Sequence, residues 1–127
     1  MKILLDTHVL LWLLSDDARL TAAMRESFLD MDNQLFFSIV SLWEMTIKIS
    51  LGKLELADNW LECLQQELSS NNIHWLPIDV AHCATLETLP FHHRDPFDRM
   101  LVAQAMTETM AIMSKDCRMR DYSLTCI

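Results

Sequence analysis

The chain contains a single glycine among its 127 residues, and this scarcity excludes several common active-site architectures. A P-loop needs two glycines, and a dinucleotide-binding fingerprint needs three. The G-x-S-x-G turn that presents a nucleophilic serine is excluded for the same reason. The one glycine, Gly52, follows Ser50-Leu51 and is typical of a residue that ends a helix.

Basic side chains are also few, since 10 Lys and Arg stand against 18 Asp and Glu, for a formal net charge of -8. A protein that coats nucleic acid without sequence preference needs a basic face to neutralise phosphates. The charge balance therefore argues against that class. It remains compatible with an enzyme that reaches phosphates through metal ions.

Zinc-binding and disulfide patterns are missing as well. No two of the four cysteines have C-x-x-C spacing, and neither His82-Cys83 nor His92-His93 has a companion pair at zinc-finger spacing. We therefore expect free thiols in a reducing cytosol. The cysteines are Cys63, Cys83, Cys117 and Cys126.

Targeting and membrane signals are absent from the sequence. No basic leader precedes the first apolar run, at 3–5, and no cleavage site follows it. The apolar run at 9–14 is far shorter than a membrane span. We therefore expect a cytoplasmic protein that is not attached to a membrane.

Length and patterning predict one α/β domain over residues 1–127. Hydrophobic residues make up 51% of the chain, enough for a core without disulfides or metal. Short apolar runs alternate with amphipathic helices, which favours a mainly parallel sheet. The expected strands are 3–5, 35–37, 73–78 and 111–113, with 123–126 as a candidate fifth strand at an edge. The expected helices are 7–14, 21–31, one from Ser38 or Ser41 to near Gly52, and three that begin at Asp58, Asp79 and Asp95-Pro96.

Four acidic residues fall at comparable places along this pattern. Asp6 and Asp116 each follow directly after an expected strand, and Glu44 lies in the helix after the second strand. Asp98 lies in the first turn of the helix that begins at Asp95-Pro96. Ligands bind beyond the carboxyl ends of the strands in an open parallel sheet. We therefore expect these four carboxylates to meet at one edge.

Four carboxylates brought together repel one another, so some must be protonated or a cation must bind between them. Ligation by oxygen alone selects hard cations, which favours Mg²⁺ or Mn²⁺ over zinc. Such a site can orient a phosphodiester and lower the pKa of an attacking water. The residues alone thus point to metal-assisted phosphodiester hydrolysis.

Each acid also has a purely structural explanation, and these alternatives remain open. Asp6 can cap the first helix, and Asp116 can cap a following turn. Ser41-Leu42-Trp43-Glu44 fits the capping box S-x-x-E, which would account for Glu44. A carboxylate at Asp98 would favour the dipole of its helix.

Four segments, in this order along the chain, resemble one known family. They are ILLDTHVLLW at 3–12, SIVSLWE at 38–44 with Lys48 and LGKL at 51–54, HHRDPFDRMLVAQA at 92–105, and SKD at 114–116. Together they resemble the acidic blocks of PIN-domain ribonucleases, and more closely those of the VapC toxins of bacterial toxin–antitoxin pairs. The fourth segment has Ser114 where the family commonly has threonine.

The resemblance implies a three-layer α/β/α PIN-like fold with a central mainly parallel sheet of four or five strands, and a Mg²⁺-dependent endoribonuclease. It makes Asp6 and Asp98 the main metal ligands, with Glu44 and Asp116 completing the site directly or through water. Asp95 fits a helix cap. The implied partners are an RNA substrate, a cognate antitoxin that covers the active-site groove, and a second copy of the chain.

Two other functions stay open at this point. The chain could be a housekeeping PIN nuclease that processes RNA without an antitoxin, or a catalytically silent PIN scaffold that binds protein or RNA. The presence of all four acids disfavours the scaffold.

Some neighbouring residues have two interpretations. Arg94 and Arg99 could hold substrate phosphates or screen the acids through salt bridges. His92 and His93 could contact RNA, although we expect a solvated loop pair. Met100, Met106, Met110 and Met113 are expected to fill the core. We expect most of the tryptophans there as well, namely Trp12, Trp43, Trp60 and Trp75.

Overall fold

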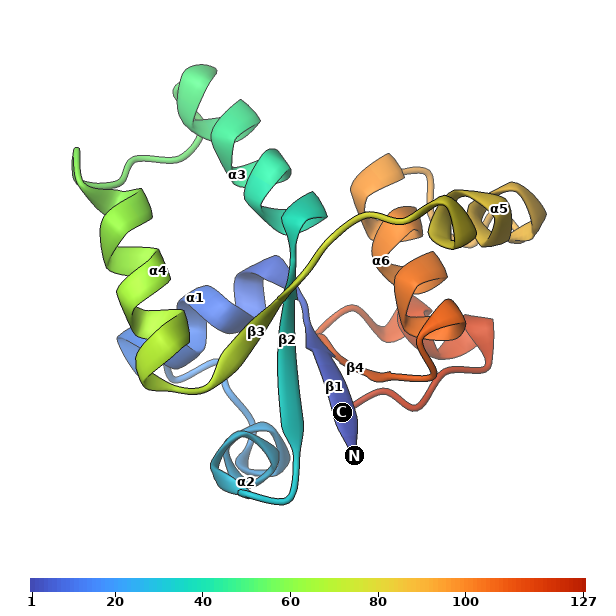
Figure 1. The fold of residues 1–127 in the computed structure, drawn as a ribbon, viewed down its shortest axis with the longest axis horizontal. Coiled ribbons are helices and arrows are strands. Elements are labelled where there is room, and N and C mark those ends of the chain that lie inside the picture. The colour runs from blue at the N-terminus through green and yellow to red at the C-terminus, as the bar shows by residue number, and fades with distance from the viewer.

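The computed structural model describes residues 1–127, except for the side chain of Cys117. Across the described residues, four strands form one sheet in the order β3-β2-β1-β4, with every neighbouring pair parallel (Figure 1). The strands are β1 (Lys2–Leu5), β2 (Gln34–Ser38), β3 (Ile73–Leu76) and β4 (Ala111–Met113). The predicted α/β class with a mainly parallel sheet is confirmed.

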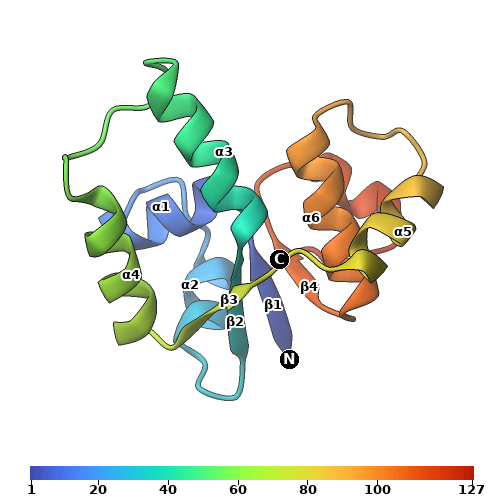
Figure 2. The same cartoon turned by 45° about the horizontal axis from the view of Figure 1, so that its top comes forward.

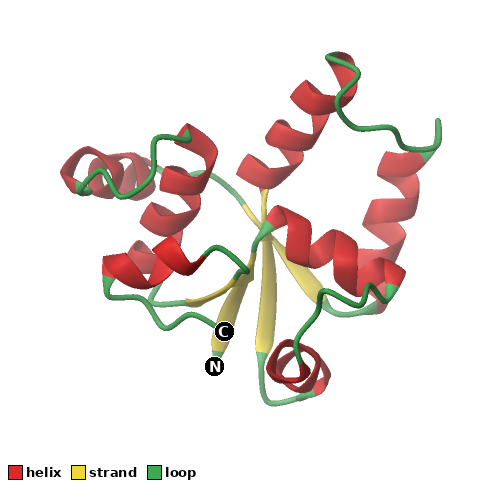
Figure 3. Cartoon of the chain, turned by 180° about the vertical axis from the view of Figure 1, so that it is seen from behind, coloured by secondary structure: helices red, strands yellow, loops and turns green.

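Helices cover both faces of the sheet, which gives three layers (Figures 1 and 2). One side carries α1 (Thr7–Ser15), α2 (Ala22–Leu29) and α4 (Trp60–Ser70), and the other carries α5 (Val80–Thr88), α6 (Pro96–Thr107) and the 3-10 helix η1 (Cys117–Tyr122). Helix α3 (Ile39–Ser50) continues upward from the carboxyl end of β2. Seen from behind, the strands lie between the two groups of helices (Figure 3).

The sheet is buried on both faces, as parallel sheets are. Ile3 and Leu5 of β1 contact one core with α1, α2 and α4, whereas Leu4 between them contacts the other core with α6. All three side chains are fully buried. This explains why the strands appear in the sequence as short continuous apolar runs rather than as an alternating pattern.

Most helix ends lie where local chemistry predicts them. Ser38 is the N-cap of α3 and accepts a hydrogen bond from the Val40 N–H. Asp79 and Asp95 cap α5 and α6 as expected. Gly52 adopts a φ of 72°, a left-handed conformation that glycine favours, just after α3.

Three local predictions are wrong. Helix α4 has Asn59 rather than Asp58 at its N-cap, and Asn59 makes no side-chain capping bond. The fifth strand is reduced to one isolated bridge between Ile112 and Cys126. Met106 is exposed because the buried face of α6 is formed by neighbours such as Val102 and Ala105.

Within the described part of the chain, every helix is too short or too polar to cross a bilayer. Cys63, Cys83 and Cys126 are free thiols.

Candidate functional site

The four predicted acids line one cavity of about 240 Å³ at the carboxyl end of the sheet. Asp6 follows β1, Glu44 lies in α3, Asp98 lies in α6, and Asp116 follows β4. The structure thus brings together side chains from four distant segments, as the edge rule for parallel sheets predicts. The cavity is also lined by His8, Trp12, Lys48, Asp95 and Lys115.

Asp6 both caps α1 and faces the cavity. Its Oδ1 accepts a 2.7 Å hydrogen bond from the Thr7 N–H, and its Oδ2 accepts a 2.8 Å bond from Ser114 Oγ. Only 9% of Asp6 is exposed, and this burial raises the pKa of its carboxyl against the opposing effect of the Ser114 hydrogen bond. The capping role and the place in the acidic cavity therefore coexist.

Glu44 is a buried acid of α3 that reaches the same cavity. Its Oε1 accepts a 3.1 Å bond from Thr7 Oγ1, and its Oε2 lies 3.0 Å from Lys48 Nζ one turn along the helix. Because Ser38 is the N-cap, the third helical position is Ser41. The capping-box interpretation of Glu44 is therefore wrong. Its side chain instead lines the cavity together with the other acids.

Asp98 occupies the third position of α6, behind the Asp95 cap. The Asp95 carboxylate accepts bonds from the N–H groups of Phe97 (2.8 Å) and Asp98 (3.2 Å). Burial, followed by the nearby charges of Asp95 and Asp6, raises the pKa of Asp98 to about 6. Burial and the neighbouring carboxylates thus both disfavour the charged form of Asp98.

Asp116 differs from the other acids because it is paired with a guanidinium, that of Arg118, 3.1 Å away. Partial burial acts to raise its pKa, but hydrogen bonds from Arg118 and His93 outweigh this effect and lower the pKa to about 2. Its Oδ1 also accepts a 3.0 Å bond from the Arg118 N–H, so it caps η1 as the alternative interpretation expected.

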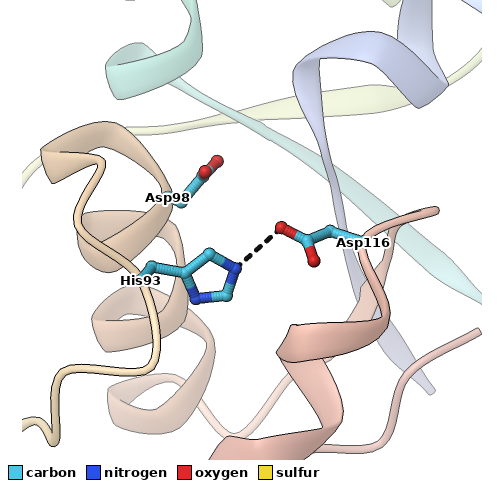
Figure 4. A group of neighbouring side chains, drawn as sticks. All are labelled: His93, Asp98 and Asp116. Carbon is cyan, nitrogen blue, oxygen red and sulfur yellow. Dashed lines mark hydrogen bonds and ion pairs between the residues drawn. The ribbon is translucent and has the colours of Figure 1, made fainter.

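His93 is a member of this cluster that the sequence analysis missed. It is buried rather than solvated, and its Nε2 lies 2.8 Å from Asp116 Oδ2 (Figure 4). Ligand atoms of His93, Asp98 and Asp116 all lie within 4.8 Å of one another. The sequence signal was the His92-His93 pair next to the Asp95 cap, but only His92 is exposed as expected.

Arg99 does not have either of its expected roles. It is buried, and its guanidinium donates to the carbonyl oxygens of Pro90 (3.0 Å) and Leu89 (3.4 Å) while lying 4.0 Å from the centre of the Phe91 ring. Arg99 therefore fixes the loop before α6. Arg94 is exposed.

The donor set fits a hard divalent cation. Carboxylate oxygens dominate the cavity, and two of its acids have raised pKa values because they are buried close to other negative charges. A cation between them would offset that repulsion. Oxygen donors are those that Mg²⁺ and Mn²⁺ prefer.

Residues 3–123 match the PIN domain family, and the chain belongs to this family. It is similar to ribonuclease VapC22 of Mycobacterium tuberculosis, with 28% identity over 121 residues that cover 94% of this chain and 91% of the relative.

Two solved structures share the fold. VapBC2 from Rickettsia felis, bound to a DNA fragment from its promoter, matches with a TM-score of 0.76 at 12% identity, over 100% of this chain and 98% of the other. DNA-bound VapBC from Salmonella typhimurium matches with a TM-score of 0.68 at 16% identity, over 100% and 97%. The match to the PIN domain over residues 3–123 confirms the predicted family.

Proposed function

We propose that residues 1–127 act as one PIN domain that cleaves RNA phosphodiester bonds internally with the help of Mg²⁺ or Mn²⁺, as the toxin of a toxin–antitoxin pair in the cytoplasm. The observation that carries the proposal is the cavity in which Asp6, Glu44, Asp98 and Asp116 converge. The similarity to a VapC ribonuclease and to VapBC complexes supports the same function.

Asp6 and Asp98 are the proposed main ligands of the cation. Both line the cavity and both have raised pKa values, so both gain most from a nearby positive charge. Glu44 and Asp116 complete the site directly or through water. When bound, Mg²⁺ or Mn²⁺ would lower the pKa of an attacking water and offset the charge of the phosphodiester.

The surrounding residues hold the acids and the substrate. Hydrogen bonds from Ser114 and Thr7 fix the carboxylates of Asp6 and Glu44, respectively. Lys48 and Lys115 line the same cavity and supply positive charge for phosphate groups of the RNA strand. These two lysines allow an acidic protein to bind a polyanion locally.

The acidic cavity also suits the proposed antitoxin. An Arg or Lys of the antitoxin placed among the four acids would satisfy the carboxylates and compete with the metal. Apolar side chains beside it would supply most of the affinity, since one solvated charge pair contributes little. We also propose that the chain forms a homodimer.

Cleavage of total RNA with purified protein tests the enzymatic proposal. We expect internal cuts that need Mg²⁺ or Mn²⁺, stop with EDTA and are lost in Asp6→Ala and Asp98→Ala. Calorimetric titration should show that both variants also lose cation binding. Glu62→Gln, an exposed acid on α4, is the matched control and should behave as wild type. Unchanged cation affinity in both alanine variants would refute the site.

Co-expression with the neighbouring gene tests the toxin assignment. A short neighbouring protein that co-purifies with this chain and restores growth supports it. Unrestricted growth when the chain is expressed alone, with no stable complex, favours the housekeeping nuclease, which remains the alternative.

A further inference from the structure

His93 contacts Asp116 through a bond whose proton can be assigned. His93 Nε2 points at the Asp116 carboxylate (Figure 4) and lies 2.8 Å from its Oδ2. The His93 side chain is fully buried. The Asp116 carboxylate also accepts from the Arg118 guanidinium, at 3.2 Å from Nε and 3.1 Å from Nη2. A carboxylate paired with a guanidinium is ionised and can only accept hydrogen bonds. The proton between His93 and Asp116 therefore belongs to Nε2.

Tyr122 occupies the other side of the same imidazole. Its hydroxyl oxygen accepts a 2.9 Å bond from the main-chain N–H of His93 and lies 3.1 Å from Nδ1. The two rings stack with their centroids 5.4 Å apart and their planes 11° apart, and Tyr122 is buried. The Tyr122 hydroxyl oxygen already accepts a hydrogen bond from the main-chain N–H, so the hydroxyl can donate its own proton to His93 Nδ1. Both ring nitrogens of His93 are thus engaged.

These contacts decide between two roles for His93. Its proximity to Asp98 and Asp116 would allow a cation site with one nitrogen and two oxygen donors. Both ring nitrogens are already engaged, however, because Nε2 lies 2.8 Å from Asp116 Oδ2 and Nδ1 lies 3.1 Å from the Tyr122 hydroxyl. We infer that His93 is a positioning residue, held by Tyr122, that fixes the Asp116 carboxylate rather than binding the cation. This inference rests on the proposed metal-dependent function.

The hydrogen bonds continue from Asp116 to Asp6 through Ser114. The Asp116 N–H donates to Ser114 Oγ at 3.0 Å, and Ser114 Oγ donates to Asp6 Oδ2 at 2.8 Å. We call Tyr122, His93, Asp116, Ser114 and Asp6 the acid brace. It connects the loop before α6 with the end of β1.

Two substitutions separate a positioning residue from a ligand. His93→Leu removes the donor to Asp116, whereas His93→Gln can place an amide N–H near the position of Nε2. Loss of a side chain that orients a metal ligand typically costs about 10–100-fold in metal affinity or activity. We expect His93→Leu to weaken Mn²⁺ binding and lower kcat by that factor, and His93→Gln to restore most of both. Glu62→Gln, the exposed acid on α4, is again the control and should stay within about twofold of wild type.

The tautomer itself is measurable without any metal. Two-bond ¹H–¹⁵N correlation spectra of the full chain should show that Nε2 of His93 carries a proton. An unprotonated Nε2 would overturn the inference, even if both His93 variants failed to fold. Equal loss of Mn²⁺ affinity in His93→Gln and His93→Leu would instead make His93 a ligand, and wild-type affinity in His93→Leu would leave it without a role. Failure of the wild-type chain to bind Mn²⁺ refutes the proposed function itself, a result distinct from these.

Discussion

Ser114 Oγ donates a 2.8 Å hydrogen bond to Asp6 Oδ2 across 108 positions of the sequence. The two residues directly follow β4 and β1, which are neighbours in the sheet. The bond opposes the effect of burial, which raises the pKa of Asp6. The pairing of these two strands therefore also controls the charge of a proposed metal ligand.

Removing the Ser114 hydroxyl should weaken cation binding in a pH-dependent way. Without that bond the pKa of Asp6 rises further, so protons compete more strongly with the metal. We expect Ser114→Ala to bind Mn²⁺ less tightly than wild type, with the larger defect near pH 6 and a smaller one near pH 8, as measured by calorimetric titration. Ser114→Thr keeps the hydroxyl and is the control. A defect of equal size at both pH values would argue against protonation of Asp6 as its cause.

Asp6→Asn should separate activity from stability. The substitution keeps the size of the side chain but removes the charge proposed for the cation. We expect RNA cleavage to fall by orders of magnitude, while the melting temperature of the metal-free protein stays the same or rises because repulsion with Glu44 and Asp98 is relieved. Gel-based cleavage assays and thermal unfolding in EDTA measure the two effects. Full activity in this variant would remove Asp6 from the mechanism.

The metal-free protein should lose stability as the pH rises from about 4 to about 6. Asp98 has a pKa of about 6 in the folded chain against its usual 3.8, so the folded state binds more protons than the unfolded state in this window. The free energy of unfolding therefore falls with increasing pH there. The raised pKa of Asp6 acts in the same direction. The low pKa of Asp116, about 2, acts oppositely, but below this window.

Urea unfolding at several pH values in EDTA tests this dependence. Asp98→Asn should flatten the decline between about pH 4 and 6. A wild-type stability that rises through this window would contradict the assigned pKa of Asp98.

Substitution of the buried Arg99 can be compared with the same substitution of the exposed Arg94 in a stability test. Arg99→Met keeps much of the buried chain volume but leaves the carbonyl oxygens of Leu89 and Pro90 without their donors. We expect a loss of about 1–3 kcal/mol in the free energy of unfolding, the usual cost of unsatisfied buried polar groups. Arg94 is exposed, so Arg94→Met should change stability by less than about 0.5 kcal/mol. Equal effects of the two substitutions would contradict the assigned role of Arg99.

Much of the fold follows from local sequence because local chemistry determines it. The run at Ile3–Leu5 predicts a buried strand, Asp79 and Asp95 act as helix caps through bonds to nearby N–H groups, and Gly52 adopts a left-handed conformation. The meeting of four acids follows from the parallel sheet, since strand ends of such a sheet share one edge.

The missed features depend on contacts between distant segments. His93 is buried because the loop before α6 packs on Tyr122, 29 positions away. Arg99 interacts with carbonyl groups of a folded loop, which no local pattern reveals. Met106 lies on a helix whose exposed face is set by its neighbours in space. Composition and spacing do not carry such information, so these residues had to be located in three dimensions.

The position of β4 late in the chain has a consequence for protein synthesis. β1 is made before the other strands, yet one of its two partner strands, β4, is made only after α6. Until the residues after β4 emerge, Ser114 cannot donate its hydrogen bond to Asp6. Lys115 and Asp116 are then also missing from the lining of the cavity. Pairing between segments so far apart in the chain is also intrinsically slow, because a long loop must be closed first. For the proposed ribonuclease, a growing chain beside ribosomal and messenger RNA would therefore lack the complete acidic cavity until residues 114–116 have emerged.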